Sequence, residues 1–279
     1  MADTVIPPGR WLEQVSGRAI DAPPHLWGFG ALHGGLALAA LTQAMQETSV
    51  DHGFVRSVAG HFHRPITGPF TTETSQPRRG RATAEAAGAT SGATLASASM
   101  VISPTRPASF PVLSPQCPPA PPAEECEPFL VPAEFVPISA FVQIRPVGPN
   151  RPYAGGDTAE LTAWMRLTED DRPPDLHRMI LLLDALPPSY TAILTTVQPV
   201  PTVELTVRPA HRLDQPTSPW VLLHAATTSA TPDGWLHERI DAFDPTGVHL
   251  ASADQLRTTV IPTSTRREDS PGPLPVQPG

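Results

Sequence analysis

Residues 92–98 read GATLASA, and residues 247–253 read GVHLASA. In both stretches a glycine suited to a turn precedes an alternating pattern that predicts a β-strand. A second strand pattern precedes each of them, in residues 57–70 and 203–220, and each ends with an Arg-Pro or His-Arg pair before a turn. The agreement predicts two related halves, although an Ala- and Ser-rich sequence can also produce so short a match by chance.

Each half also contains one strongly apolar segment that predicts a helix ahead of its strands. These segments are LHGGLALAALTQAMQ at 32–46 and LHRMILLLDALPP at 176–188. A unit with one long apolar helix and a run of antiparallel strands must bury the helix against the sheet. We therefore expect an α+β fold that occurs twice in tandem.

Proline is concentrated between residues 104 and 152, where neither helical nor alternating periodicity persists. Such a segment is typical of a linker. The segment RREDSPGPLPVQPG is polar and rich in proline and glycine, which is typical of a fraying chain end. We expect a first domain at 1–103, a linker at 104–152, a second domain at 153–265 and a flexible tail at 266–279.

The charge balance argues against several classes of protein. The formal net charge is −8, and all the basic side chains are arginines. An acidic chain lacks the concentrated basic surface of a nucleic-acid-binding protein. The absence of lysine, with abundant proline and alanine, indicates a GC-rich genome such as that of an actinobacterium. No signal peptide pattern is visible and no apolar stretch reaches the roughly 20 residues of a membrane span, so we expect a cytoplasmic protein without a membrane partner.

A single carboxylate, Asp184, follows four aliphatic residues in the second predicted helix. An ionised carboxylate in apolar surroundings is costly unless it is hydrogen-bonded or takes part in chemistry. The first predicted helix has Thr42 at the corresponding position and starts with Gly34 and Gly35. Glycines at a helix start let a ligand approach the free N–H groups, which stabilise negative charge as an oxyanion hole does. Tight packing of the helix against a strand is the other explanation for these glycines.

The second half adds two polar candidates. Thr202 opens the strand after the Asp184 helix, and Gln255 follows the GVHLASA stretch. Each could be an ordinary strand residue when taken alone. Together with Asp184 they belong to the pattern through which the chain resembles the TesB-like type II acyl-CoA thioesterases, a double-hotdog family, in their actinobacterial form. The segments that carry the resemblance are FGALHGGLALAAL, HFHRPI, SGATLASASMVI, ILLLDALPP, PTVELTV and GVHLASADQLR.

The resemblance implies a fold and a reaction. The fold is a double hotdog, in which two tandem units each wrap a curved antiparallel sheet around a long helix. The reaction is hydrolysis of an acyl thioester by a water molecule that Asp184 activates and that Thr202 and Gln255 hold, without a covalent intermediate. The start of the first helix, at residues 33–35, would bind the substrate and polarise the thioester carbonyl.

The implied substrate is an acyl thioester of coenzyme A or of an acyl carrier protein, in lipid metabolism, and no further cofactor is expected. Arg78, Arg79 and Arg81 could bind the phosphates of coenzyme A, or they could form a solvated hairpin turn. His61 and His63 alternate along one strand, but no third ligand follows at a suitable spacing, so we expect no metal site. The sequence leaves open whether the chain forms a homo-oligomer.

Two other functions remain open at this point. The first is a hydratase or dehydratase on the same fold in a biosynthetic pathway, for which His33 would serve as the base instead of only binding substrate. The second is a protein that binds an acyl thioester without hydrolysing it. The set of Asp184, Thr202 and Gln255 favours hydrolysis, because dehydratase chemistry usually needs a histidine with an acid across the site.

Overall fold

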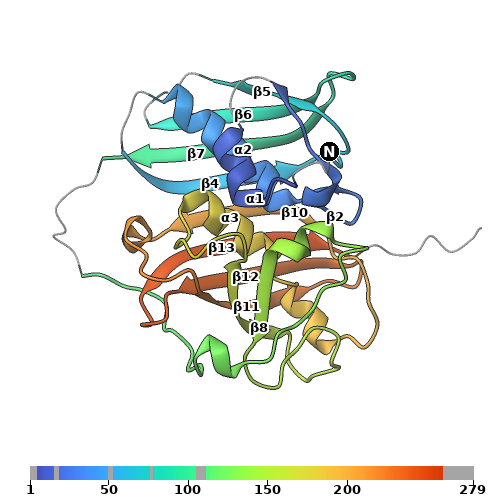
Figure 1. The fold of residues 1–279 in the computed structure, drawn as a ribbon, viewed down its shortest axis with the longest axis vertical. Helices are drawn as coiled ribbons and strands as arrows, with labels where there is room; N and C mark the ends of the chain where they lie inside the picture. The colour runs from blue at the N-terminus through green and yellow to red at the C-terminus, as the bar shows by residue number, and fades with distance from the viewer. Residues whose placement is uncertain are drawn as a thin grey trace, which may run out of the picture.

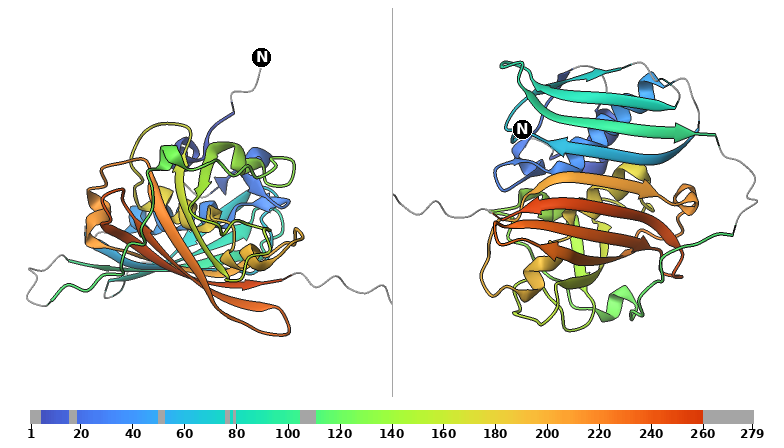
Figure 2. Two further views of the ribbon diagram at one scale, coloured as in Figure 1. Left: turned by 90° about the horizontal axis from the view of Figure 1, so that it is seen from below. Right: turned by 180° about the vertical axis from the view of Figure 1, so that it is seen from behind.

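The structure, a computed structural model, describes most of the chain. The predicted flexible tail at 266–279 lies outside the described residues. One large antiparallel sheet dominates the architecture, and it curves around helices that lie on one of its faces (Figure 1, Figure 2). The described residues are 5–15, 19–49, 53–75, 78, 80–104 and 111–259.

The two halves of the chain contribute successive sets of elements. The first half contains α1 (Pro8–Gln14), β1 (Ala19–Ile20), β2 (Trp27–Gly28), β3 (Ala31–Leu32), α2 (Gly34–Thr48), β4 (Phe54–Phe62), β5 (Phe70–Thr74), β6 (Arg81–Gly88) and β7 (Thr94–Ser103). The second half contains β8 (Val142–Pro146), β9 (Glu160–Leu167), α3 (Leu176–Ala185), β10 (Thr202–Pro209), β11 (Val221–Ala230), β12 (Trp235–Phe243) and β13 (His249–Thr258). In the first half, α2 directly precedes the first long strand, β4, as predicted. In the second half, β8 and β9 come before α3, so the prediction of a helix ahead of all its strands is wrong there.

The strand order repeats outward from a central seam. The main sheet runs β1-β5-β6-β7-β4-β10-β13-β12-β11-β9-β8, and β4 pairs with β10 in antiparallel register, with Val58 opposite Val207. The repeated stretches lead into β7 and β13, which occupy matching places beside β4 and β10. Gly92 and Gly247 ahead of them have φ values of 63° and 83°, which glycine adopts readily. The internal repeat is therefore a repeat of topology.

Small inward-facing side chains let α2 lie close to the sheet. Ala82, Ala84 and Ala86 on β6 are buried and alternate with exposed residues. On β4, a Cβ added to Gly60 would lie 2.7 Å from Leu38 Cδ1 of the helix. The helix itself is built from alanine and leucine, which are strong helix formers, and its buried side chains fill the space that the small strand residues leave.

The proline-rich segment differs from the expected linker in how it packs. Residues 142–146 form β8, the outermost strand of the second half, although they fall within the range predicted as linker. Pro121 and Cys126 of this segment, which lie upstream of β8, contact the second half directly. The carbonyl of Pro121 accepts a hydrogen bond from the indole N–H of Trp164 at 2.8 Å, and Cys126 is buried with Trp164 and Phe243. Proline has no N–H for a sheet ladder, so this segment docks through its carbonyls and side chains instead.

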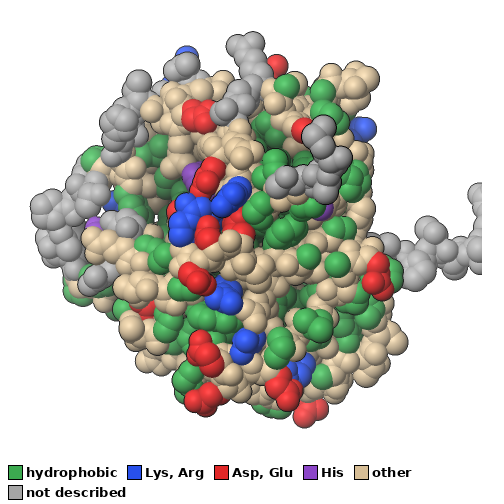
Figure 3. Space-filling view, in the orientation of Figure 1, with side chains coloured by type: hydrophobic (Ala, Val, Ile, Leu, Met, Phe, Trp, Pro, Cys, Tyr) green, Lys and Arg blue, Asp and Glu red, His purple; other side chains and the backbone are tan. Residues whose placement is uncertain are grey.

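Ion pairs connect α1 to the second half. Glu13 Oε1 lies 2.6 Å from Arg172 Nη2 and 3.5 Å from Arg178 Nη2. Arg178 is only 4% exposed and also lies 3.4 Å from Asp170 Oδ2. In the orientation of Figure 1, acidic and basic side chains gather over the middle of the face, with apolar side chains around them (Figure 3). The two signs of charge are mixed on this face.

The two main helices touch backbone to backbone at Gly35. A Cβ added there would lie 3.0 Å from Leu181 Cα, 3.1 Å from the Ile180 carbonyl oxygen and 2.9 Å from Asp184 Cβ. Backbone atoms cannot move aside as a flexible side chain can. The packing explanation for this glycine therefore applies, with a helix rather than a strand as the neighbour.

We expect Gly35→Ala to lower the melting temperature, because the added methyl group overpacks the helix contact. Overpacking typically costs about 1–3 kcal/mol, whereas alanine in place of glycine would otherwise favour a helix by about 1 kcal/mol. Thermal unfolding measures the balance. Gly68→Ala is the matched control, since a Cβ added there would have no neighbour within 4 Å. Equal stability of the two variants would contradict the packing argument.

Candidate active site

Helix α3 delivers Asp184 to the centre of the molecule. The helix begins after Asp175, whose Oδ1 accepts a hydrogen bond from the Arg178 amide at 2.9 Å, and it ends before a pair of prolines. Asp184 lies in its last turn, and the side chain is 5% exposed. A buried carboxylate needs hydrogen-bond donors around it, and four groups surround this one.

The first carboxylate oxygen, Oδ1, accepts two side-chain hydrogen bonds. The hydroxyl of Thr202, at the start of β10, donates to it at 2.9 Å. The amide of Gln255, on β13, donates to it from Nε2 at 3.0 Å. The structure thus brings together the three residues predicted as the catalytic set. Thr202 and Gln255 contact the carboxylate directly.

The second carboxylate oxygen, Oδ2, faces the start of α2. The backbone N–H of Gly35 donates to it at 2.6 Å, and a Cβ added to Gly34 would lie 3.0 Å from it. His33 Nδ1 lies 3.4 Å from the same oxygen. The predicted substrate-binding residues therefore meet the predicted catalytic residues here. The Gly35 N–H, a predicted oxyanion donor, is bound to Asp184 in this structure.

Burial disfavours the charged form of His33. Burial lowers the pKa of its imidazole, and the positive charge of Arg257 lowers it further, while Asp184 acts in the opposite direction. The Nδ1 of His33 is buried and has no hydrogen-bond partner among the described residues. A neutral imidazole next to a carboxylate can accept or relay a proton.

Two charged residues that sequence reasoning missed lie behind this set. Arg257, on β13, donates from Nε to Glu238 Oε2 at 2.7 Å and from Nη1 to Thr202 Oγ1 at 3.0 Å. Its Nη2 donates to Gln255 Oε1. Glu238, on β12, accepts the Ser189 N–H with its other oxygen. In the sequence, Glu238 alternates with the apolar residues Leu236 and Ile240, whereas Arg257 follows polar Gln255 on the same face and leaves no comparable signal.

Two of the predicted arginines, Arg78 and Arg81, are exposed residues near the start of β6. Arg78 and Arg81 pair through their backbones at the start of β6, where each N–H donates to the other's carbonyl. Arg81 is exposed and alternates with buried Ala82, so it lies on the sheet face opposite the helices. Arg79 lies outside the described residues. The structure does not bring Arg78 or Arg81 to the candidate site.

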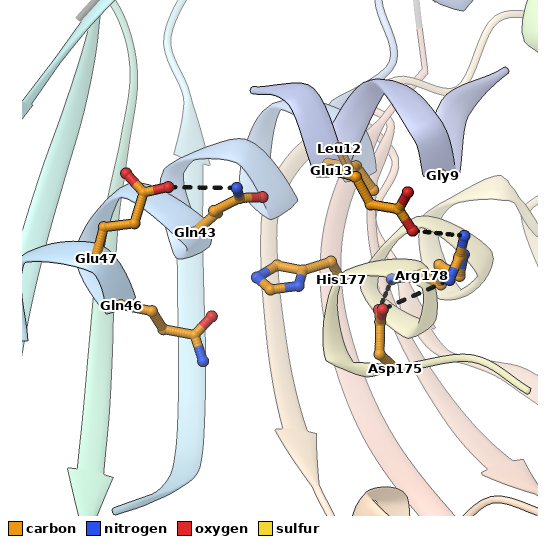
Figure 4. A pocket seen from close by; sticks show the side chains of 9 residues that line it. All are labelled: Gly9, Leu12, Glu13, Gln43, Gln46, Glu47, Asp175, His177 and Arg178. Atoms are coloured by element: carbon orange, nitrogen blue, oxygen red, sulfur yellow. Dashed lines mark hydrogen bonds and ion pairs between the residues drawn. The ribbon is translucent and has the colours of Figure 1, made fainter. Parts of the chain in front are cut away.

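The opposite end of the helix pair has a different character. Thr42, the counterpart of Asp184 on α2, is fully buried and its hydroxyl donates to the Leu38 carbonyl at 2.7 Å. A cavity of about 320 Å³ lies near this end, between α1, α2 and α3 (Figure 4). Gln43, Gln46 and His177 are among its lining residues. No carboxylate occupies the position equivalent to Asp184, so the two ends are chemically unequal.

Among the described residues, no cluster of three or more histidine, cysteine, aspartate or glutamate side chains is arranged to hold a metal ion. No helix in the described part of the chain has the length and apolar character of a membrane span.

The architecture defines the chain as a hotdog-type protein, and solved structures agree. A conserved protein of unknown function with a hot dog fold from Alicyclobacillus acidocaldarius has a TM-score of 0.78 and 20% identity, over 89% of this chain and 95% of the other. A putative thioesterase II from Thermobifida fusca has a TM-score of 0.74 and 23% identity, over 90% and 97%. The acyl-CoA thioesterase II TesB2 of Mycobacterium marinum has a TM-score of 0.60 and 18% identity, over 82% and 90%.

Family models identify both halves. Residues 23–103 match the acyl-CoA thioesterase N-terminal domain, and residues 115–258 match the acyl-CoA thioesterase C-terminal domain. The chain belongs to the acyl-CoA thioesterase family, and the predicted resemblance to TesB-like thioesterases is confirmed. It is accordingly a thioesterase. No curated protein sequence matches the chain.

Acid should destabilise the protein partly through His33. Because the pKa of His33 is lowered in the folded state, its contribution to stability is complete above about pH 6.5, the ordinary histidine pKa, and is lost as the pH falls through the lowered value. We expect His33→Asn to lose less melting temperature between neutral and mildly acidic pH than the parent. His177, whose pKa burial also lowers, remains in both proteins. The exposed His63→Asn is the control, and an equal pH slope in parent and His33→Asn would contradict the assignment.

Proposed function

We propose that the chain hydrolyses the thioester bond of an acyl-CoA, with Asp184 as the general base for the attacking water and without a covalent enzyme intermediate. The observation that carries the proposal is the meeting of Thr202, Gln255 and Gly35 at one buried carboxylate. An ionised carboxylate held by three donors is oriented before the substrate arrives. General-base catalysis of this kind typically contributes about 10²–10⁴-fold to a rate.

The two oxygens of Asp184 have different roles in this proposal. Oδ1 already accepts two hydrogen bonds, from Thr202 and Gln255, which use both of its lone pairs. Oδ2 accepts one hydrogen bond, from Gly35, and its second neighbour His33 lies at the longer distance of 3.4 Å. Oδ2 is therefore the oxygen that takes the proton of the attacking water, on the side of His33.

The start of α2 would stabilise the oxyanion that forms when water attacks the thioester carbonyl. Its free N–H groups and the helix dipole carry partial positive charge, and removing one oxyanion donor from an enzyme can cost about 3–4 kcal/mol of transition-state stabilisation. The Gly35 N–H contacts Asp184 here, so the substrate carbonyl must share or replace this bond. Substrate binding then frees Oδ2 of Asp184 at the moment when it must accept a proton.

The remaining features of the proposal follow from the family and the fold. We propose that each half is a hotdog unit and that the seam between β4 and β10 joins them into a double hotdog. The substrate is a thioester of coenzyme A or of an acyl carrier protein, and no other cofactor takes part. A cytoplasmic setting and a homo-oligomer are consistent with this reaction.

A second candidate is hydration or dehydration of an acyl thioester. The observation that favours it is the proximity of His33 Nδ1 to Asp184 Oδ2, at 3.4 Å, since such chemistry needs a histidine and an acid across one site. The lowered pKa of His33 favours a neutral imidazole, which would suit a base. The hydrolase proposal assigns His33 to substrate binding instead.

Free-thiol release from a panel of acyl-CoAs, from short to long chain, tests the main proposal. We expect the parent to release thiol and Asp184→Asn to lose the activity by about 10²-fold or more, because the amide cannot accept the proton. Asp254→Asn is the matched control: Asp254 lies next to Gln255 on β13 but is half-exposed and pairs with Arg208. Melting temperatures show that each variant is folded.

Other outcomes distinguish the alternatives. Loss of the ultraviolet absorbance of an enoyl-CoA without thiol release, abolished by His33→Asn, would favour the hydratase. Stabilisation of the parent by an acyl-CoA that it neither hydrolyses nor hydrates would favour a binding protein. Full activity in Asp184→Asn would contradict the role of Asp184.

A further inference from the structure

A buried ion pair lies directly behind the candidate base. Arg257 and Glu238 are 4% and 3% exposed, and the guanidinium Nε donates to Glu238 Oε2 at 2.7 Å. The pair occupies inward positions of β13 and β12, where Glu238 lies between the apolar residues Leu236 and Ile240 and Arg257 follows Gln255 on the inward face. Replacing a buried ion pair by apolar residues of similar volume is often neutral or stabilising, so stability alone does not explain such a pair.

The guanidinium determines which way the Gln255 amide faces. Arg257 has only donors, and Nη2 donates to Gln255 Oε1. The carboxylate of Asp184 has only acceptors, and Gln255 Nε2 donates to it at 3.0 Å. In a flipped amide, the NH₂ group of Gln255 would face the donating Nη2 of Arg257, and its carbonyl oxygen would face the accepting carboxylate of Asp184. Only one orientation of the amide satisfies both neighbours, and in it the amide donates to Asp184.

The same guanidinium determines the direction of the Thr202 hydroxyl. Arg257 Nη1 donates to Thr202 Oγ1 at 3.0 Å, which directs the single hydroxyl proton elsewhere. The hydroxyl therefore donates its hydrogen bond to Asp184 Oδ1, and the two oxygens lie 2.9 Å apart. Both donors on Oδ1 are therefore oriented by one planar group. Glu238 in turn holds that group through Nε and is itself held by the Ser189 N–H.

We propose that Arg257 is a positioning residue for the Asp184 site and that Glu238 holds it in place. Arg257 orients Gln255 and Thr202 so that both donate to Oδ1, which leaves Oδ2 to accept the proton of the water. This inference rests on the proposed function, since it assigns Asp184 as the base. The planar fork of arginine is required, because one group must donate to three acceptors in fixed directions.

The charged and titratable groups around Asp184 come from three elements. His33 precedes α2, Arg257 lies on β13, and Glu238 lies on β12 behind Arg257. Loss of the oriented donors removes hydrogen bonds that favour the ionised, proton-accepting form of Asp184. The acid limb of the pH profile of kcat/KM should therefore move to higher pH when the orientation is lost, which a purely structural role would not produce.

The test compares Arg257→Met with the double variant R257M/E238M. The single variant leaves a buried carboxylate without its partner and should lose stability. The double variant removes both charges, and we expect it to recover melting temperature but not activity. Its kcat should fall by roughly 100-fold with little change in KM, and Arg257→Lys should recover only part of the loss. Arg239→Met is the matched control, since Arg239 follows Glu238 on β12 but is half-exposed and pairs with Asp241.

A second measurement does not depend on hydrolysis. The side-chain amide signals of Gln255 in the ¹⁵N NMR spectrum can be assigned by their loss in Gln255→Leu, and we expect them to shift in R257M/E238M but not in R239M. If the parent hydrolyses no thioester, the proposed function fails while this shift still tests the orienting role. A folded double variant with the kcat and pH profile of R239M would overturn the inference. Unchanged Gln255 signals would overturn it as well.

Discussion

The antiparallel pairing of β4 with β10 is the constraint on which the rest of the molecule depends. It joins two half-sheets into one curved layer, so the helices that each half must bury come to lie on the same face. With both helices on one face, α2 and α3 meet where Gly35 allows their backbones to touch. A residue near the end of one helix then lies at the start of the other. The Asp184 site exists because of this arrangement.

The same arrangement explains why one end of the helix pair differs from the other. Two related helices each have a start and a position that corresponds to Asp184. At one end that position holds Asp184 with four surrounding groups, and at the other it holds Thr42, which bonds to its own helix. A duplicated chain can specialise one end and leave the other for packing. A symmetric pair of identical chains could not make this distinction.

The interior around Asp184 is unusually polar for the centre of a protein, yet its groups are matched. Glu238, Arg257, Gln255 and Thr202 form a chain of donors and acceptors that ends at Asp184 Oδ1. A satisfied buried network rigidifies its members, whereas an incomplete one would be costly. The exception is His33 Nδ1, which has no hydrogen-bond partner among the described residues. That unsatisfied atom faces the oxygen at which the proposal places the reaction.

The sequence by itself determined the duplication, the two helices and the identity of the central carboxylate, because these follow from periodicity, turn glycines and one acid in an apolar run. Asp184, Thr202 and Gln255 could be named through a family resemblance, since their residue types and order match. The docking of the proline-rich segment could not be predicted, because its contacts are carbonyls and side chains without a periodic signal. Nor could the sequence predict the contacts that Arg257 and Glu238 make beside Asp184. Leu256 lies between Gln255 and Arg257, so the strand pattern does not say which face is inward, and only the pairing of β13 with β10 and β12 turns the polar residues toward Asp184.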